Sequence, residues 1–358
     1  MRWIWIFSVC LLFALPHSAT AQSDTALLTI THDERVTFAG WNTSETQLLT
    51  TSEDGAIRLS DAQTGEQIWQ TTHTASIDGA SWSHDDSLIV AWGADNLLFL
   101  INAQTGEIID TNQNDNPIHG GLWKRDDSAV MIYTDNFIAI PTIRGNSSFG
   151  AAIFGTPLSA PIISAQWSAD ETKILIFDES LTLYLWDTIL GSDVRSFRLP
   201  EATTGIAWSA DETRLASWGL DSDVRVWDLT ENGLVASGQS FPHSRTFVIG
   251  AQWAMNDTVL LTWGADETAR LWDIATSEEK IRVRHTDWVT GARLNADATK
   301  LITWAYQFGY VWDANTGELI LQVSHDNLVS GAILNGDESR LLTWGWDGTA
   351  RVWEINES

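Results

Sequence analysis

Short apolar runs separated by turn residues recur along this chain about every ten residues. Runs such as Leu88–Val90 and Ile174–Ile176 lie between segments rich in Gly, Asp and Asn. Such a pattern is typical of antiparallel β-strands joined by tight turns. Four of these strands fill a period of about 42 residues, which is the size of one β-propeller blade. The pattern therefore predicts an all-β repeat protein.

The repeat is clearest at an anchor residue that ends the first predicted strand of each unit. The anchors are Trp41, Trp82, Trp123, Trp167, Trp208, Trp253, Leu294 and Leu334, spaced 40 to 45 residues apart. An acidic turn follows the anchor, then an apolar strand, a turn with Asp in most units, and a third strand that often ends in Trp-Asp. Eight such units predict a single eight-bladed propeller of four-stranded antiparallel blades.

The part of the chain that follows residue 21 divides into eight predicted blades. They lie near residues 32–72, 73–114, 115–157, 158–199, 200–242, 243–284, 285–324 and 325–358. The last unit ends after its third strand, and the segment 25–31 before the first unit reads as a strand without another partner. We predict that this segment closes the ring as the outer strand of blade eight. The alternative is seven blades, with the third unit lost because its third strand lacks Trp-Asp.

These motifs resemble those of the WD-repeat (Trp-Asp repeat) β-propeller family over essentially all of residues 25–358. The resemblance implies a brace of His, Asp and Trp within a blade. Matching sets are His243, Asp266, Trp272 and His325, Asp347, Trp353. The family also uses Ser or Thr two residues before the Asp, where this chain mostly has Gly. We therefore expect an incomplete brace.

A departure from the family lies on the second strands, where most WD repeats carry a small residue. Here aromatic residues recur, and the tryptophans among them are Trp92, Trp218, Trp263, Trp304 and Trp344. We expect them to pack between blades and to replace the lost polar brace, because a buried indole removes a large apolar surface from water. The alternative is a ring of aromatic side chains that lines one mouth of the channel.

Candidate binding residues are those that break the repeat. In WD-repeat proteins the position before the turn Asp faces the upper surface and often contacts partners. Large residues occupy it at Leu220, Tyr306 and Trp346, and Trp288 opens blade seven nearby. Because exposed aromatic residues are enriched at interfaces, we expect these four residues to bind a partner. Packing under a loop is the alternative.

The first 21 residues have the layout of a secretory signal peptide. Met1-Arg2 supplies a positive start, an apolar run extends from Trp3 to Leu15, and small residues precede position 22. An uncleaved anchor is the alternative, although the run is short for a membrane span. The single cysteine, Cys10, lies inside this run. We therefore expect a secreted or periplasmic chain without disulfides, without membrane insertion after cleavage, and monomeric.

The net charge of the chain excludes one class of function. The chain has 47 acidic and 20 basic residues, which gives a net charge of −27 and argues against nucleic-acid binding. The repeated histidines fall once per blade, too far apart for a shared metal, so we expect no metal and no cofactor. We identify no catalytic residue.

The best interpretation is an exported, non-enzymatic recognition scaffold that binds a protein, peptide or glycan on the upper face. The alternative is an extracytoplasmic propeller enzyme of the quinoprotein dehydrogenase or glycan-processing type. A segment similar to the docking motif of quinoprotein dehydrogenases runs from Asp61 to Trp69, but it occurs complete only once.

Overall fold

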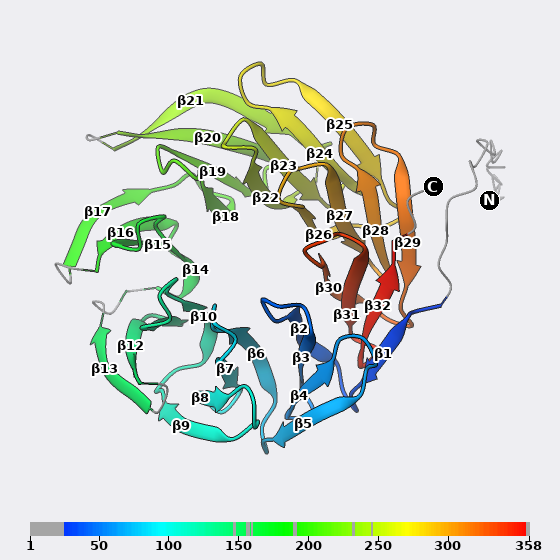
Figure 1. Cartoon of the computed structure of the whole chain (residues 1–358). Helices are drawn as coiled ribbons and strands as arrows, with labels where there is room; N and C mark the ends of the chain where they lie inside the picture. The colour runs from blue at the N-terminus through cyan, green and yellow to red at the C-terminus, as the bar shows by residue number, and fades with distance from the viewer. Residues whose placement is uncertain are drawn as a thin grey trace, which may run out of the picture.

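The computed structural model describes residues 25–145, 148–154, 158, 160–188, 192–230, 233–244 and 246–355. Its thirty-two strands form eight antiparallel sheets of four strands each. The sheets stand radially around a ring (Figure 1). The predicted eight-bladed propeller is therefore confirmed. The predicted signal peptide, residues 1–21, lies outside the described residues.

Each blade places one strand at each of four positions from the centre of the ring to its rim. The innermost strands are β2 (Val36–Trp41), β6 (Ile77–Trp82), β10 (Ile118–Trp123), β14 (Ile162–Trp167), β18 (Thr203–Trp208), β22 (Val248–Ala254), β26 (Val289–Leu294) and β30 (Val329–Leu334). The second strands are β3 (Gln47–Ser52), β7 (Leu88–Gly93), β11 (Val130–Thr134), β15 (Lys173–Asp178), β19 (Arg214–Gly219), β23 (Val259–Gly264), β27 (Lys300–Ala305) and β31 (Arg340–Gly345).

The third strands are β4 (Ala56–Asp61), β8 (Leu97–Asn102), β12 (Ile138–Arg144), β16 (Thr182–Asp187), β20 (Asp223–Thr230), β24 (Thr268–Asp273), β28 (Phe308–Asp313) and β32 (Thr349–Glu354). The outer strands are β5 (Gln67–Thr72), β9 (Ile108–Gln113), β13 (Ser148–Phe154), β17 (Ser192–Arg198), β21 (Gly233–Pro242), β25 (Glu279–Arg284), β29 (Leu319–Ser324) and β1 (Leu28–Thr31).

Blade three is complete, so the seven-blade alternative is wrong. Its sheet has the order β10-β11-β12-β13. The third strand lacks Trp-Asp, but Ile138 and Ile140 are buried and pack with Ile162 and Trp186 of blade four. Apolar packing against the next blade thus holds this strand in place without the usual tryptophan.

The two ends of the described chain meet in blade eight. Strand β1 pairs antiparallel with β32, with Leu28 opposite Val352 and Thr31 opposite Thr349. Ile30 is buried in a cluster with Val352. Figure 1 shows this blue strand beside the red one. The predicted closure is therefore confirmed, and it covers the edge that β32 would otherwise expose.

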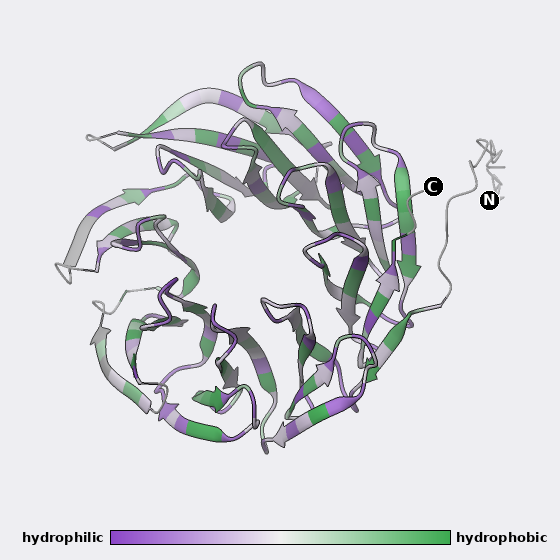
Figure 2. Ribbon diagram, in the orientation of Figure 1, coloured by the Kyte–Doolittle hydropathy of each residue, from purple (hydrophilic) through white to green (hydrophobic). Residues whose placement is uncertain are grey.

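The hydrophobic core lies between blades rather than at one centre. One cluster joins Leu49 and Ile57 of blade one to Ile77 and Ile89 of blade two, and all four are buried. Apolar and polar residues alternate along the strands (Figure 2), as expected where side chains point to opposite faces of a sheet. Each blade therefore buries its apolar surface against its neighbours.

The tryptophans of the second strands pack against glycines of the innermost strands. The opposed pairs are Gly79 with Trp92, Gly205 with Trp218, Gly250 with Trp263, Gly291 with Trp304 and Gly331 with Trp344. A Cβ atom at Gly291 would overlap the indole of Trp304. The Trp218 indole N–H also donates to the Ile249 carbonyl of the next blade, at 3.0 Å. These indoles therefore pack within a blade and between blades.

Candidate functional site

Every innermost strand carries a bulge near its start. The pairing register with the second strand shifts around one residue in each blade, namely Thr37, Asp78, His119, Ile163, Thr204, Ile249, Thr290 and Ser330. A bulge re-aims a side chain and is often found beside functional sites. The bulge residue is acidic only in blade two, where it is Asp78, and it is a histidine only in the adjacent blade three, where it is His119.

We call the side of the ring with the turns between second and third strands the upper face. A cavity of about 430 Å³ on this side is shared by residues of blades one, two, three and eight. We call it the mouth cavity. It is lined by Arg35, Val36, Thr37, Asp78, Trp92, Ile118, His119, Ser330 and Trp346. Because four blades contribute to it, it lies where their innermost strands converge.

Charged and aromatic groups are combined at the mouth cavity. The Arg35 guanidinium carbon lies 4.9 Å from the centre of the Trp346 ring, and Arg35 Nη2 lies 2.8 Å from Glu53 Oε1. This stacking is a cation–π contact. Burial raises the pKa of Asp78, although a hydrogen bond from Ser76 and the Arg35 charge oppose the rise. The cavity therefore offers an indole, a cation and a carboxyl group to a ligand.

The imidazole at the mouth cavity has its own partner. His119 Nε2 lies 2.6 Å from Asp135 Oδ1, and both side chains are exposed. This pair is open to solvent, and it adds a polar wall to the cavity.

The four residues predicted to bind a partner are all exposed on the described surface. The exposed fractions are 64% for Leu220, 50% for Trp288, 49% for Tyr306 and 47% for Trp346. Only Trp346 lines the mouth cavity. Trp288 instead packs edge-on against Phe247, with ring centres 5.1 Å apart.

The other two exposed residues sit on turns away from the cavity. Tyr306 occupies the two-residue turn after β27 with φ 50°, and its carbonyl accepts the Val329 N–H at 2.8 Å. Leu220 lies in the corresponding turn of blade five. Among the residues that the structure describes, no ring contact joins Trp288, Tyr306 and Trp346. The structure thus brings Trp346 together with Arg35, Asp78 and His119, which the sequence analysis did not select.

The brace of blade six is complete, so the expectation of an incomplete brace is wrong. His243 Nδ1 lies 2.9 Å from Asp266 Oδ1, and His243 Nε2 lies 2.8 Å from Thr262 Oγ1. The Trp272 indole N–H donates to Thr262 Oγ1 at 2.8 Å. The hydroxyl thus comes from four residues before the Asp, on the second strand, rather than from two residues before it. Blade eight repeats this arrangement with His325, Asp347, Thr343 and Trp353.

These bonds fix the charge of the brace carboxylates. Burial alone would raise the pKa of Asp266, but hydrogen bonds from His243, the Ser244 N–H and Thr268 hold it well below its usual range. Burial would also raise the pKa of Asp347, but the hydrogen bond and the charge of His325 oppose it and hold this pKa below its usual range. Both carboxylates are therefore ionised at neutral pH and serve structure.

Blade seven lacks the brace carboxylate. The two-residue turn at Tyr306 and Gln307 replaces the longer turn that carries Asp in blade eight. His285 Nε2 still lies 2.8 Å from Thr303 Oγ1, but the buried His285 Nδ1 has no hydrogen-bond partner among the described residues. Burial lowers the pKa of His285 to about 4. This histidine is therefore neutral in the folded protein at pH 7.

The segment similar to a quinoprotein docking motif serves blade packing. Asp61 Oδ1 accepts the Gln63 N–H at 2.9 Å and the Thr64 N–H at 2.8 Å, which closes the turn. Trp69 lies on Gly106 of blade two, and its indole N–H donates to the Ala103 carbonyl at 2.8 Å. The motif is therefore explained as a contact between blades.

Within the residues that the structure describes, no group of three or more His, Cys, Asp or Glu side chains is placed to hold a metal ion. The same residues include no helix long and apolar enough to cross a membrane.

Comparisons with known proteins agree with the repeat and the fold. A family model described as "WD domain, G-beta repeat" matches residues 191–228. The fold is similar to Saccharomyces cerevisiae Sqt1, with 14% identity, a TM-score of 0.80, and coverage of 94% of this chain and 100% of that one. It is also similar to the C-terminal WD40 domain of Sif2, with 14% identity, a TM-score of 0.76, and 93% and 98% coverage.

A third similar structure is the computationally designed Ika8 protein, with 18% identity, a TM-score of 0.77, and coverage of 92% of this chain and 99% of that one. No curated protein matches the chain by sequence. At these identities the likeness to solved structures concerns the fold.

We predict that the unpaired His285 makes stability depend on pH. Its pKa is about 4 when folded, against about 6.5 when unfolded, so the unfolded chain binds more protons between these values. Its contribution to stability is full above pH 6.5 and declines as the pH falls toward 4. Between pH 7 and pH 5 the loss is about 2 kcal/mol. Urea unfolding of the wild type and His285→Gln at both pH values checks this, and an equal loss in both proteins would contradict it.

Proposed function

We propose that this β-propeller, part of which matches a WD-repeat family model, is a non-enzymatic scaffold that recognises a polypeptide at the mouth cavity of its upper face. Propellers of this type support protein interaction in general. Our proposal adds the surface that binds the partner, which is the mouth cavity. A rigid ring of blades suits this task, because a preorganised surface loses little conformational freedom when a partner binds.

The observation that carries the proposal is the stacked pair of Arg35 and Trp346. Trp346 is 47% exposed although it is a large aromatic residue. Arg35 holds one face of its ring, and Glu53 holds the guanidinium. Tryptophan and arginine are the residue types most often found to dominate binding energy at interfaces. An exposed indole already fixed in orientation is a suitable anchor for an apolar side chain of a partner.

Polar groups beside this anchor provide specificity. Asp78 and His119 lie on the same cavity from the neighbouring blades two and three. They can exchange hydrogen bonds with the backbone of an inserted peptide, while Trp346 packs against one of its side chains. The rest of the upper face lacks this combination at the bulge position, where the other blades carry Thr, Ser or Ile. A binding site limited to part of the ring is therefore expected.

The enzyme alternative receives no comparable support. The segment from Asp61 to Trp69, which suggested a quinoprotein, packs one blade on the next. Propellers similar to this one are generally non-enzymatic scaffolds. Recognition therefore remains the better proposal.

The proposal predicts that Trp346→Ala weakens binding without unfolding the protein. Peptides selected on the wild type from a random display library should lose at least tenfold in affinity for the variant, which is about 1.4 kcal/mol. Val235→Ala, at an exposed residue of the outer strand β21, is the matched control and should retain binding. Selected peptides that bind Trp346→Ala as tightly as the wild type would contradict a mouth-cavity site.

We further propose that the scaffold acts outside the cytoplasm. The layout of residues 1–21 supports export, and the only cysteine lies within that segment. Contacts between blades, rather than disulfides, would then stabilise the exported domain. Sequencing the N-terminus of the protein recovered from the native host checks this part. A new terminus near Gln22 in an extracytoplasmic fraction is expected, whereas an intact Met1 in the cytoplasm would contradict it.

A further inference from the structure

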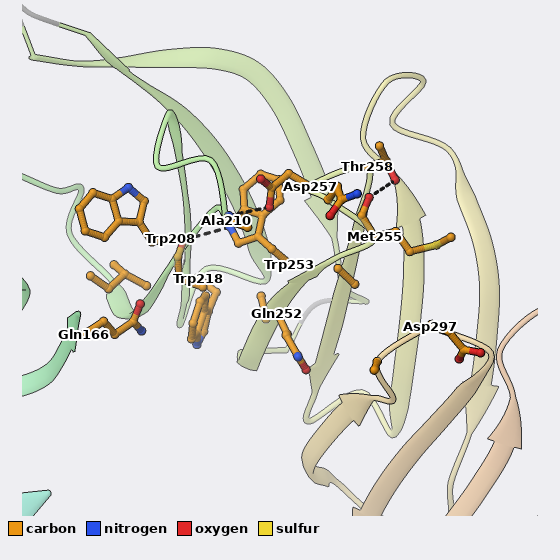
Figure 3. A pocket seen from close by; sticks show the side chains of 16 residues that line it. Gln166, Trp208, Ala210, Trp218, Gln252, Trp253, Met255, Asp257, Thr258 and Asp297 are labelled. Carbon is orange, nitrogen blue, oxygen red and sulfur yellow. Dashed lines mark hydrogen bonds between the residues drawn. The ribbon is translucent and has the colours of Figure 1, made fainter. Parts of the chain in front are cut away.

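A second cavity opens on the side of the ring that carries the turns between first and second strands, which we call the lower face. It has a volume of about 890 Å³ and is shared by residues of blades four to seven. We call it the lower cavity. Figure 3 shows Gln166, Trp208 and Trp218 toward one end of it and Met255 and Asp297 toward the other. This volume is within the range of small-molecule sites, and the spread of the lining suits an extended ligand.

Three tryptophans line the lower cavity, and one of them is unused by the protein. Trp218 and Trp253 each donate the indole N–H to a backbone carbonyl, at 3.0 Å in both. The Arg214 guanidinium carbon also lies 4.9 Å from the centre of the Trp253 ring. Trp208 is half-buried, and among the described residues its N–H has no acceptor and its ring stacks on no cation or aromatic ring. The Trp208 indole is therefore available to a ligand.

Two glutamines line the lower cavity from equivalent strand positions. Gln166 on β14 and Gln252 on β22 each precede the anchor tryptophan, and Ala207 holds this position on β18 between them. The other five blades carry Gly, Ser, Leu, Arg or Ile there. Equivalent positions on equivalent strands project their side chains in the same direction. The small Ala207 thus leaves a space between two side-chain amides, and this arrangement occurs once in the ring.

The side-chain amides of the lower cavity are not used within the protein. They belong to Gln166, Gln252 and Asn256, and none of the three has a hydrogen-bond partner among the described residues. Asn42, elsewhere on the lower face, instead bonds Ser44 and Gln47 with the two ends of its amide. Each free amide offers both donors and an acceptor. The cavity therefore presents neutral groups that bind water or a ligand in both directions.

The charges at the lower cavity disfavour an acidic ligand. Its described lining includes Asp257 and Asp297 but no Lys, Arg or His. Asp257 is buried, and both its oxygens accept backbone N–H groups of blade five. Hydrogen bonds from Thr299 hold the pKa of Asp297 below its usual range, so this carboxylate is ionised at neutral pH. An anion would be repelled here, whereas a neutral ligand with hydroxyl groups can donate to Asp297.

A pyranose sugar has the chemistry that this lining matches. Its ring faces expose C–H bonds, which the negative face of an indole attracts. Its hydroxyl groups both donate and accept hydrogen bonds, as carboxamides do. In β-linked sugars of the glucose type the hydroxyls lie around the rim, so both ring faces remain flat. Apart from Ile206 and Met255, the apolar lining consists of alanines and indoles, which leaves few pockets for the aliphatic side chains of a peptide.

We propose that the lower cavity binds a neutral oligosaccharide of β-linked, glucose-type rings. One ring stacks on Trp208, and the amides of Gln166 and Gln252 bind its hydroxyls. Asn256 and Asp297 bind the hydroxyls of a following ring. This site is separate from the mouth cavity, because the two open on opposite faces of the propeller. A bound oligosaccharide thus leaves the polypeptide site free.

Isothermal titration calorimetry of the whole protein with cellotriose and chitotriose tests the proposal. Both neutral trisaccharides should bind, and the acidic trigalacturonate should not. Gln166→Leu and Gln252→Leu remove the amides and keep the side-chain size, so each should weaken binding at least tenfold. Gln307→Leu, the same substitution in an upper-face turn, is the matched control and should bind like the wild type. Trp346→Ala should also bind like the wild type, which separates this result from the polypeptide site.

The stacking on Trp208 has its own readout. Saturation-transfer NMR should place the strongest signals on the ring C–H protons of the bound sugar, and Trp208→Phe should weaken binding. If Trp208→Phe fails to fold, the two glutamine variants still decide.

Three results would overturn the proposal. Failure of both neutral trisaccharides to bind the wild type would show that the cavity takes no such sugar. Unchanged affinity in Gln166→Leu and Gln252→Leu would place the sugar elsewhere. Tighter binding of the deacetylated, cationic form of chitotriose than of chitotriose itself would show that the carboxylates, rather than the amides and the indole, select the ligand.

Discussion

Contact between neighbouring blades is the constraint on which this structure depends. A four-stranded sheet has two faces, and here neither face has a separate core to cover it. The clusters of buried residues join consecutive blades, as Leu49 and Ile57 do with Ile77 and Ile89. Because every blade needs both neighbours, the ring must close, and β1 closes it on β32. The hydrophobic effect therefore acts around the ring rather than toward a single centre.

Directional contacts refine this apolar packing. The indoles of the second strands lie on glycines of the innermost strands, and the carboxylates of the lower face join consecutive turns. The brace of His243, Asp266, Thr262 and Trp272 ties the strands within a blade. Function is proposed where this regular scheme changes, at the charged bulges of the mouth cavity. A repeated scaffold makes such an exception visible, since the other blades carry Thr, Ser or Ile at the same position.

The sequence was sufficient for the architecture because the architecture repeats. Anchors such as Trp82 and Trp123 recur in phase, and the unpaired segment 25–31 had one free edge to cover. The brace hydroxyl was missed because Thr262 was not considered, being two residues further from Asp266 than the family pattern places it. Asp78 and His119 were missed because a bulge changes where a strand residue points, which the alternation of polar and apolar residues does not reveal. Arg35 was missed because it precedes β2, where no strand pattern applies. The carboxylates of the lower face bind turns more than 40 positions away, as Asp86 does with Thr43. The sequence did offer a signal for them, because an acidic residue recurs four positions after most anchors.

The most direct test of the account is a double-mutant cycle on Gly291 and Trp304, measured as the free energy of unfolding. A methyl group at Gly291 overlaps the Trp304 indole, so Gly291→Ala should cost about 1–3 kcal/mol in the wild type. The same substitution should cost much less in a Trp304→Ala background, because the obstructing ring is gone. Costs that simply add would contradict the claim that the indoles of the second strands are seated on the glycines of the innermost strands.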